Sequence, residues 1–80
     1  MDIIKVFSNN VKKYRKIKGF SQEELGYRSG LHRTYISSLE RQRRSIALDN
    51  IQKIADALEI ETYKLFMNDD SKNGRTKEGD

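Results

Sequence analysis

The sequence predicts a single all-α domain of five helices. Apolar residues recur at spacings of three and four, glycines stand where helices would end, and no alternation of useful length indicates a strand. The chain has 80 residues, 35% of them hydrophobic, so it can build one small core and little else. We expect the folded domain to cover residues 1–67.

The first helix is expected over residues 2–18. Its apolar face is formed by Ile4, Phe7, Val11 and Tyr14, which are spaced as neighbours on one side of a helix. Gly19 follows and can adopt the left-handed conformation that ends many helices.

A second, short helix is expected to begin after Ser21 and to end at Gly30. Ser21 and Glu24 have the spacing of a capping box, in which each side chain satisfies a backbone N–H of the other's turn. A third helix then follows from Arg33, with Ile36 and Leu39 on its buried face.

These two helices match a helix-turn-helix pattern. Gly26 stands where the helices cross, and Gly30 takes the turn because a positive φ is easiest without a Cβ. In this motif the second helix enters the major groove of DNA. A plain helical hairpin would share the glycine turn but not all seven positions, which are Gln22, Leu25, Gly26, Gly30, Leu31, Ile36 and Leu39.

The last third of the chain predicts two further helices and a tail. The fourth helix has its apolar face at Leu48, Ile51, Ile54, Ala55 and Leu58. A short fifth helix would contain Leu65 and Phe66. Residues 68–80 hold no apolar side chain, and we expect them to be a disordered polar tail.

Charge is distributed unevenly along the chain. The net charge is +4, but residues 12–44 carry ten basic and three acidic side chains, whereas residues 45–80 carry five basic and eight acidic ones. The basic half is suited to bind phosphate groups. The alternative is that its charges only solvate helix faces.

Composition argues against several classes of protein. Cysteine is absent and His32 is the single histidine, so we expect no disulfide, no metal site and no cofactor. So short a chain also makes an enzyme improbable. No apolar run approaches the length of a membrane span and no secretory signal is visible, so we expect a cytoplasmic protein, associated with the nucleoid if it binds DNA.

The motifs resemble a known family. Residues 19–25 (GFSQEEL) are similar to the GLSQEELA opening of the Xre/Cro-type helix-turn-helix proteins, and residues 36–41 and 51–58 resemble that family's recognition-helix ending and fourth helix. This resemblance covers residues 3–67. It implies a five-helix lambda-repressor-like DNA-binding domain, with the helix-turn-helix at helices two and three.

A narrower resemblance concerns the recognition helix. Residues 33–37 (RTYIS), followed by Glu40 and Arg41, are similar to the controller proteins of restriction–modification systems. That resemblance implies a small homodimeric transcription regulator that acts on its own promoter and on the restriction gene. A phage or plasmid repressor, or an antitoxin, would share the framework. A protein-interaction module that has lost DNA binding is disfavoured because the arginines remain.

Candidate DNA-binding residues follow from the expected position of the third helix. Its outward side chains are candidates for base readout, since arginine can donate two hydrogen bonds to guanine; they are Arg33, Thr34, Tyr35 and Ser37. Residues at the start of the second helix and after the third are candidates for phosphate contacts: Gln22, Arg41, Gln42, Arg43 and Arg44. The expected partner is a near-palindromic DNA operator, with RNA polymerase as a further candidate.

Two other groups are given structural roles. The resemblance implies an ion pair between Arg15 and Glu40 that ties the first helix to the recognition helix. Tyr63, Phe66 and Met67 are candidates for a two-fold interface, together with parts of the fourth helix. Three residues depart from the family pattern: Gly26 replaces alanine, His32 stands where the recognition helix has a Ser or Asp cap, and Ala47 where the fourth helix has Ser or Thr.

Overall fold

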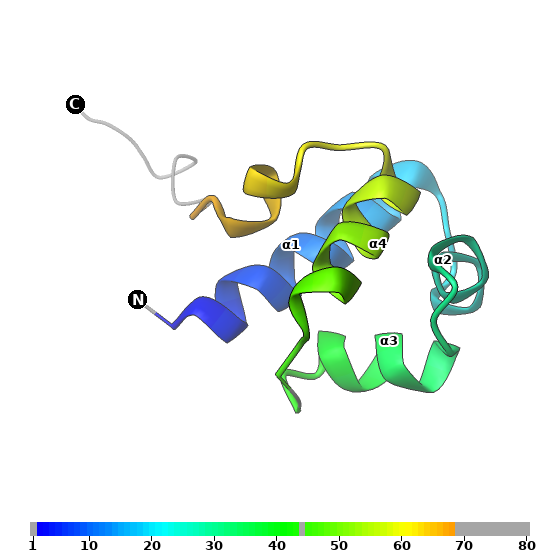
Figure 1. Ribbon diagram of the computed structural model, residues 1–80, viewed down its shortest axis with the longest axis horizontal. Helices are drawn as coiled ribbons and strands as arrows, with labels where there is room; N and C mark the ends of the chain where they lie inside the picture. Colours follow the sequence, from blue (N-terminus) through cyan, green and yellow to red (C-terminus); the bar gives the residue numbers. More distant parts are fainter. Residues whose placement is uncertain (1, 44, 69–80) are drawn as a thin grey trace.

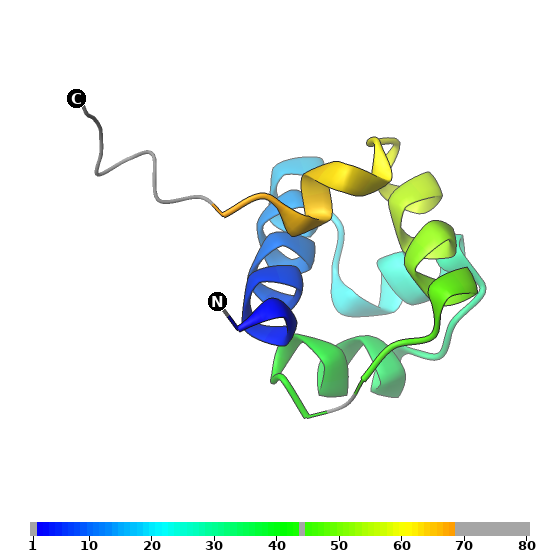
Figure 2. The same cartoon turned by 60° about the vertical axis from the view of Figure 1, so that its left-hand side comes forward.

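The computed structural model describes residues 2–43 and 45–68. Over this part of the chain the fold is entirely helical. The elements are α1 (Ile3–Lys18), α2 (Gln22–Ser29), α3 (Arg33–Glu40), α4 (Leu48–Leu58) and the 3₁₀ helix η1 (Thr62–Phe66). In Figure 2, α1 and α4 lie on opposite sides of the molecule, while α3 closes one end and η1 the other.

The expected fifth α-helix is corrected to η1, which is a 3₁₀ helix of five residues. Its backbone bonds join Lys64 to Glu61 at 3.0 Å, the spacing of a 3₁₀ turn. Its length is too short to repay the nucleation of an α-helix, and Glu61 makes no capping bond through its side chain. The expected tail lies, apart from Asn68, outside the described residues.

The first helix begins one residue later than expected, at Ile3, because Asp2 is its N-cap. The Asp2 carboxylate accepts a hydrogen bond from the backbone N–H of Lys5 at 3.2 Å.

No helix within residues 2–43 and 45–68 is long and apolar enough to cross a membrane. The same described part holds no cluster of three or more His, Asp or Glu side chains that could bind a metal ion.

A single core joins all five elements. Its buried members are Phe7, Val11, Leu25, Ile36, Leu39, Ile51, Ile54, Ala55, Leu58 and Leu65. Phe66 of η1 stacks on Phe7 of α1, with 5.3 Å between the ring centroids. The apolar periodicity of the sequence therefore predicts the buried face of α3 and most of that of α4 correctly. It is wrong for Leu48 at the start of α4, which is 84% exposed, and for Ile4 of α1, which is 40% exposed.

Asn10, a polar residue of α1, fastens η1 to the core. Only 4% of Asn10 is exposed, and its side-chain amide donates to the backbone oxygens of Leu65 and Met67, both at 2.9 Å. The amide thus satisfies carbonyls at the end of a helix that is too short to satisfy them itself.

All four α-helices end in the same way, with two backbone hydrogen bonds that close around a residue in the left-handed conformation. Gly19 and Gly30 take this position in α1 and α2, whereas Gln42 (φ 62°) and Glu59 (φ 60°) take it in α3 and α4. This is the Schellman arrangement, which favours glycine. Lys18 donates to the Glu59 carboxylate, and this bond lowers the pKa of that carboxyl.

Gly26 lets α2 approach the turn into α3 very closely. A Cβ at this position would lie 2.7 Å from the backbone oxygen of Leu31 and 3.1 Å from the backbone nitrogen of Arg33. Both atoms belong to the backbone, so neither can move aside as a side chain can. The sequence interpretation of Gly26 as a crossing point agrees with this geometry, and it gives the reason why alanine is absent.

Replacing this glycine tests the close approach. We expect Gly26→Ala to lower the free energy of unfolding by about 1–3 kcal/mol, the usual cost of overpacking, despite a gain of up to ~1 kcal/mol in helix propensity. Thermal or urea unfolding followed by circular dichroism measures the change. Tyr27→Ala, at a position that is 83% exposed, is the control and should stay within about 0.5 kcal/mol. A more stable Gly26→Ala protein would contradict the proposed clash.

Candidate nucleic-acid interface

The outward face of α3 and the start of α2 form one shallow hollow on the surface. α3 runs along one edge of the molecule (Figure 1) and turns Ile36 and Leu39 inward. The hollow is lined by Gln22, Arg33, Thr34, Ser37 and Arg41. The structure therefore brings together five of the residues that the sequence analysis selected for DNA contact.

Two arginines border the hollow. Arg33 is 66% exposed at its side chain, and its guanidinium lies 4.0 Å from the Glu23 carboxylate, the outer limit for an ion pair. At such exposure this pair is weak, so Arg33 can turn to another partner. Arg41 donates to the Ser37 hydroxyl at 2.6 Å. Both positive charges thus sit at the surface, where a polyanion can reach them.

Tyr35 does not line the hollow with its neighbours on α3. Its ring is half-buried against the core, and its hydroxyl accepts a hydrogen bond from the side-chain amide of Asn50 in α4 at 3.2 Å. Asn50 was not selected from the sequence, and its spacing within α4 gives no signal for this contact. Tyr35 therefore lies at the junction of α3 and α4.

The residues after α3 are exposed. Gln42 takes the left-handed position, and the backbone N–H of Arg43 donates to the Ser38 oxygen at 3.0 Å. The bond turns the chain sharply and leaves the Arg43 side chain in solvent. Arg44, the remaining candidate for a phosphate contact, lies outside the described residues.

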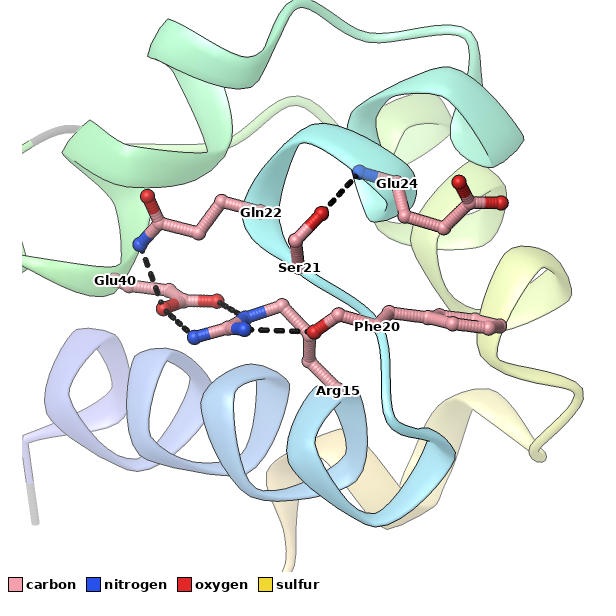
Figure 3. Close-up of polar contacts among 6 residues, drawn as sticks. All are labelled: Arg15, Phe20, Ser21, Gln22, Glu24 and Glu40. Carbon is pink, nitrogen blue, oxygen red and sulfur yellow. Dashed lines mark hydrogen bonds and ion pairs between the residues drawn. The ribbon is translucent and has the colours of Figure 1, made fainter.

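Arg15 and Glu40 form a buried ion pair beneath the hollow (Figure 3). The Arg15 Nε and Nη2 atoms donate to the two Glu40 carboxylate oxygens at 2.7 and 3.0 Å. The two side chains are only 11% and 3% exposed. Arg15 also donates from Nη1 to the backbone oxygen of Phe20 at 2.8 Å. All three nitrogen atoms of the guanidinium therefore donate a hydrogen bond within the protein.

Gln22 approaches the same carboxylate from the side opposite Arg15 (Figure 3). Its Nε2 donates to Glu40 Oε1 at 3.1 Å. An amide nitrogen carries two hydrogens, so the second can donate to a group outside the protein. Gln22 also stands at the first turn of α2, where backbone N–H groups and the helix dipole attract anions.

The start of α2 corrects one expectation. Ser21 accepts from the backbone N–H of Glu24 at 2.9 Å, which is one half of the expected capping box. The Glu24 side chain, however, points away from Ser21 (Figure 3) and accepts from Arg28 one turn later at 2.6 Å. A charged partner at i+4 competes successfully with the backbone N–H.

His32 and Ala47 show how the two unusual caps behave. The His32 ring accepts from the backbone N–H of Thr34 at 3.0 Å, so the imidazole performs the task of a Ser or Asp cap. Ala47 makes no capping bond through its side chain. The start of α4 therefore leaves its first N–H groups without this type of partner.

Comparison with known proteins identifies the family to which this fold belongs. A helix-turn-helix family profile matches residues 11–65. The chain belongs to the helix-turn-helix family. The matched residues include the whole of α2, α3 and α4.

Several helix-turn-helix relatives are similar to this chain over most of its length. A hypothetical transcription factor from Neisseria meningitidis serogroup B is 47% identical over 66 residues, which are 82% of this chain and 62% of that protein. Control protein C.SmaI from Serratia marcescens is 44% identical over 73 residues, 91% of this chain and 87% of that protein. This chain thus spans less than two thirds of the Neisseria protein but most of C.SmaI.

A solved structure extends the likeness to a DNA complex. The restriction–modification controller protein C.Esp1396I, crystallised as a tetramer with its natural 35 base-pair operator, superimposes with a TM-score of 0.76. The two sequences are 36% identical, and the match covers 82% of this chain and 87% of that one.

The buried ion pair yields a prediction about stability. We expect Glu40→Gln to lower the free energy of unfolding by about 3–5 kcal/mol, because Arg15 would remain buried without its counter-charge. Urea unfolding measures the change. Glu24→Gln breaks an exposed pair on α2 and should cost less than about 1 kcal/mol. If both variants lost the same small amount, the pair would have no special role.

Proposed function

We propose that this chain is a sequence-specific DNA-binding transcription regulator of the controller type found in restriction–modification systems. It would act on its own promoter and on the restriction gene, in the cytoplasm and associated with the nucleoid, with RNA polymerase as a further partner at the promoter. The hollow at α2 and α3 carries this proposal, because it gathers two surface arginines, a first-turn glutamine and two hydroxyls on one side of the molecule.

In this proposal α3 enters the major groove. Arg33, at its first turn, donates two hydrogen bonds to guanine O6 and N7, while Thr34 and Ser37 reach neighbouring base edges. Gln22, Arg41, Gln42, Arg43 and Arg44 contact phosphates on either side. Tyr35 takes part at the end of the interface that faces α4, where Asn50 holds its hydroxyl.

The similar proteins support this assignment. C.SmaI is a control protein, and C.Esp1396I binds an operator as a tetramer. Sequencing the DNA that flanks the gene tests the controller role. A neighbouring methyltransferase or endonuclease gene is expected, whereas a toxin gene or phage operon would favour an antitoxin or a phage repressor of the same fold.

Base reading and phosphate binding can be separated by mutation. Arg33→Ala should lose about 1–3 kcal/mol of binding free energy on the operator and much less on scrambled DNA. Arg43→Ala should weaken binding to both duplexes alike and reduce the slope of log K against log salt by about 0.9. Titrations of both variants at several salt concentrations measure these effects. Equal losses on both duplexes for Arg33→Ala would make it a phosphate contact.

We also propose a two-fold interface at η1. Tyr63 and Met67 are 61% and 55% exposed, and Phe66 borders an apolar groove that continues over Ile3 and Ile4 of α1. Exposed apolar surface of this kind is typical of protein contacts. A homodimer would place two α3 helices about 34 Å apart, one turn of DNA, on a near-palindromic operator.

Sedimentation of the free protein, and of its complex with a palindromic duplex, tests this interface. The wild type is expected to sediment as a dimer, and Met67→Asp to shift the equilibrium towards monomer and to weaken operator binding. Tyr27→Asp, at an 83% exposed position of α2 outside η1, α4 and this groove, is the control for altered charge in the sedimentation of the free protein. One protein chain per palindromic duplex would contradict the interface.

A further inference from the structure

The single histidine contacts its neighbour Thr34 in two ways. His32 Nδ1 lies 3.0 Å from the backbone nitrogen of Thr34 and 2.7 Å from its Oγ1 atom. We propose that His32 is a specificity-determining residue that acts through Thr34, by making the Thr34 hydroxyl an acceptor, and not a donor, towards the DNA bases. This inference rests on the proposed function.

The protonation of the ring follows from the backbone contact. A backbone N–H can only donate, so Nδ1 must present its lone pair to Thr34 and the neutral ring carries its hydrogen on Nε2. A hydrogen on Nδ1 would point at the hydrogen of the backbone N–H.

The direction of the hydroxyl follows in turn. Because Nδ1 has no hydrogen to give, the 2.7 Å contact requires Thr34 to donate its hydroxyl hydrogen to the ring, and the single lone pair of Nδ1 then accepts from both the backbone N–H and the hydroxyl of Thr34. A hydroxyl has one hydrogen and two lone pairs. Only the lone pairs and the methyl group of Thr34 therefore remain for an outside partner.

Thr34 is exposed and lines the hollow beside Arg33. In the major groove, the N6 amino group of adenine and the N4 amino group of cytosine donate, whereas guanine N7 and O6 and thymine O4 accept. Phosphate oxygens also only accept. An acceptor at Thr34 consequently selects adenine or cytosine, and it disfavours the phosphate contact that a hydroxyl could otherwise make.

The hydroxyl of Ser37, one turn further along α3, has the opposite hydrogen-bonding role within the protein. Its hydroxyl oxygen accepts from Arg41 at 2.6 Å, and this bond does not use the hydroxyl hydrogen. The two hydroxyls on this face of α3 therefore differ in which of their atoms remain available for an outside hydrogen bond. His32 directs the hydrogen of Thr34 inward, and Arg41 occupies a lone pair of Ser37.

The test uses a duplex enriched from a random-sequence library by the wild-type protein, together with its single base-pair variants. The position contacted by Thr34 is the one whose preference changes in Thr34→Val, which keeps the methyl group and removes the hydroxyl. Wild type should prefer adenine or cytosine there by about fivefold, as expected of one hydrogen bond.

Two substitutions at position 32 separate the roles of the ring. His32→Gly retains an acceptable N-cap residue but frees the Thr34 hydroxyl, so the preference should fall to about twofold or less. His32→Asn supplies an amide oxygen as acceptor in place of Nδ1 and should restore the preference. In the Thr34→Val background, His32→Gly should change base preference no further. Thermal unfolding of each variant verifies that it is folded.

The outcomes distinguish this inference from the proposed function. If the wild type enriches no sequence, both are overturned. If the wild type enriches a sequence but His32→Gly keeps the full preference and only melts earlier, His32 is a helix cap alone and the inference is overturned while the proposed function stands. A preference for guanine or thymine at the Thr34 position would overturn it as well.

Discussion

The buried ion pair of Arg15 and Glu40 is the interaction on which the proposed recognition face, the side of α2 and α3 that lines the hollow, depends. It joins the last turn of α1 to the last residue of α3, with both side chains almost removed from solvent. Burying two charges is costly unless their hydrogen bonds are satisfied. Here the Phe20 backbone oxygen accepts a further hydrogen bond from Arg15, and Gln22 donates a further one to Glu40. The carboxylate consequently fixes three segments, namely α1, α3 and the start of α2, in one arrangement.

The other constraints of the motif act at its opposite end. Gly26 allows backbone contact between α2 and the turn into α3, and the His32 ring accepts from the backbone N–H of Thr34 in the first turn of α3. The ion pair thus anchors the last residue of α3 to α1, and the exposed His32 cap stabilises the first turn of α3. The backbone of α3 is thereby held in place, as the base reading proposed for its outward side chains requires.

Much of this fold could be predicted from the sequence, because the helices are amphipathic and end at glycines. Gly19 and Gly30 mark the ends of α1 and α2, whereas Gln42 and Glu59 adopt the same left-handed conformation without a sequence signal. Periodicity identified Leu65 and Phe66 as apolar but could not show that they form a 3₁₀ helix. The buried Asn10, which stabilises that helix, is chemically indistinguishable in sequence from an exposed asparagine.

The candidate site likewise contains features that the sequence predicts and features that only the structure shows. Residue types and motif spacing selected the side chains that line the hollow, because a helix presents residues three and four apart on one face. Spacing could not show that Asn50 binds Tyr35 or that Glu24 turns to Arg28, since these contacts depend on how helices pack and on competition among partners. The hydrogen-bond polarity of Thr34 likewise depends on the position of a ring atom that only coordinates provide.

The central claim is that the buried carboxylate positions the recognition face as well as stabilising the fold. Replacing the pair by apolar residues, Arg15→Met with Glu40→Leu, tests it most directly, because such replacements often preserve stability while they remove the anchor of Gln22. We predict that this double variant unfolds with nearly wild-type stability but binds the enriched duplex at least about tenfold more weakly, a loss of about 1.4 kcal/mol. Wild-type stability together with wild-type operator affinity would contradict the claim.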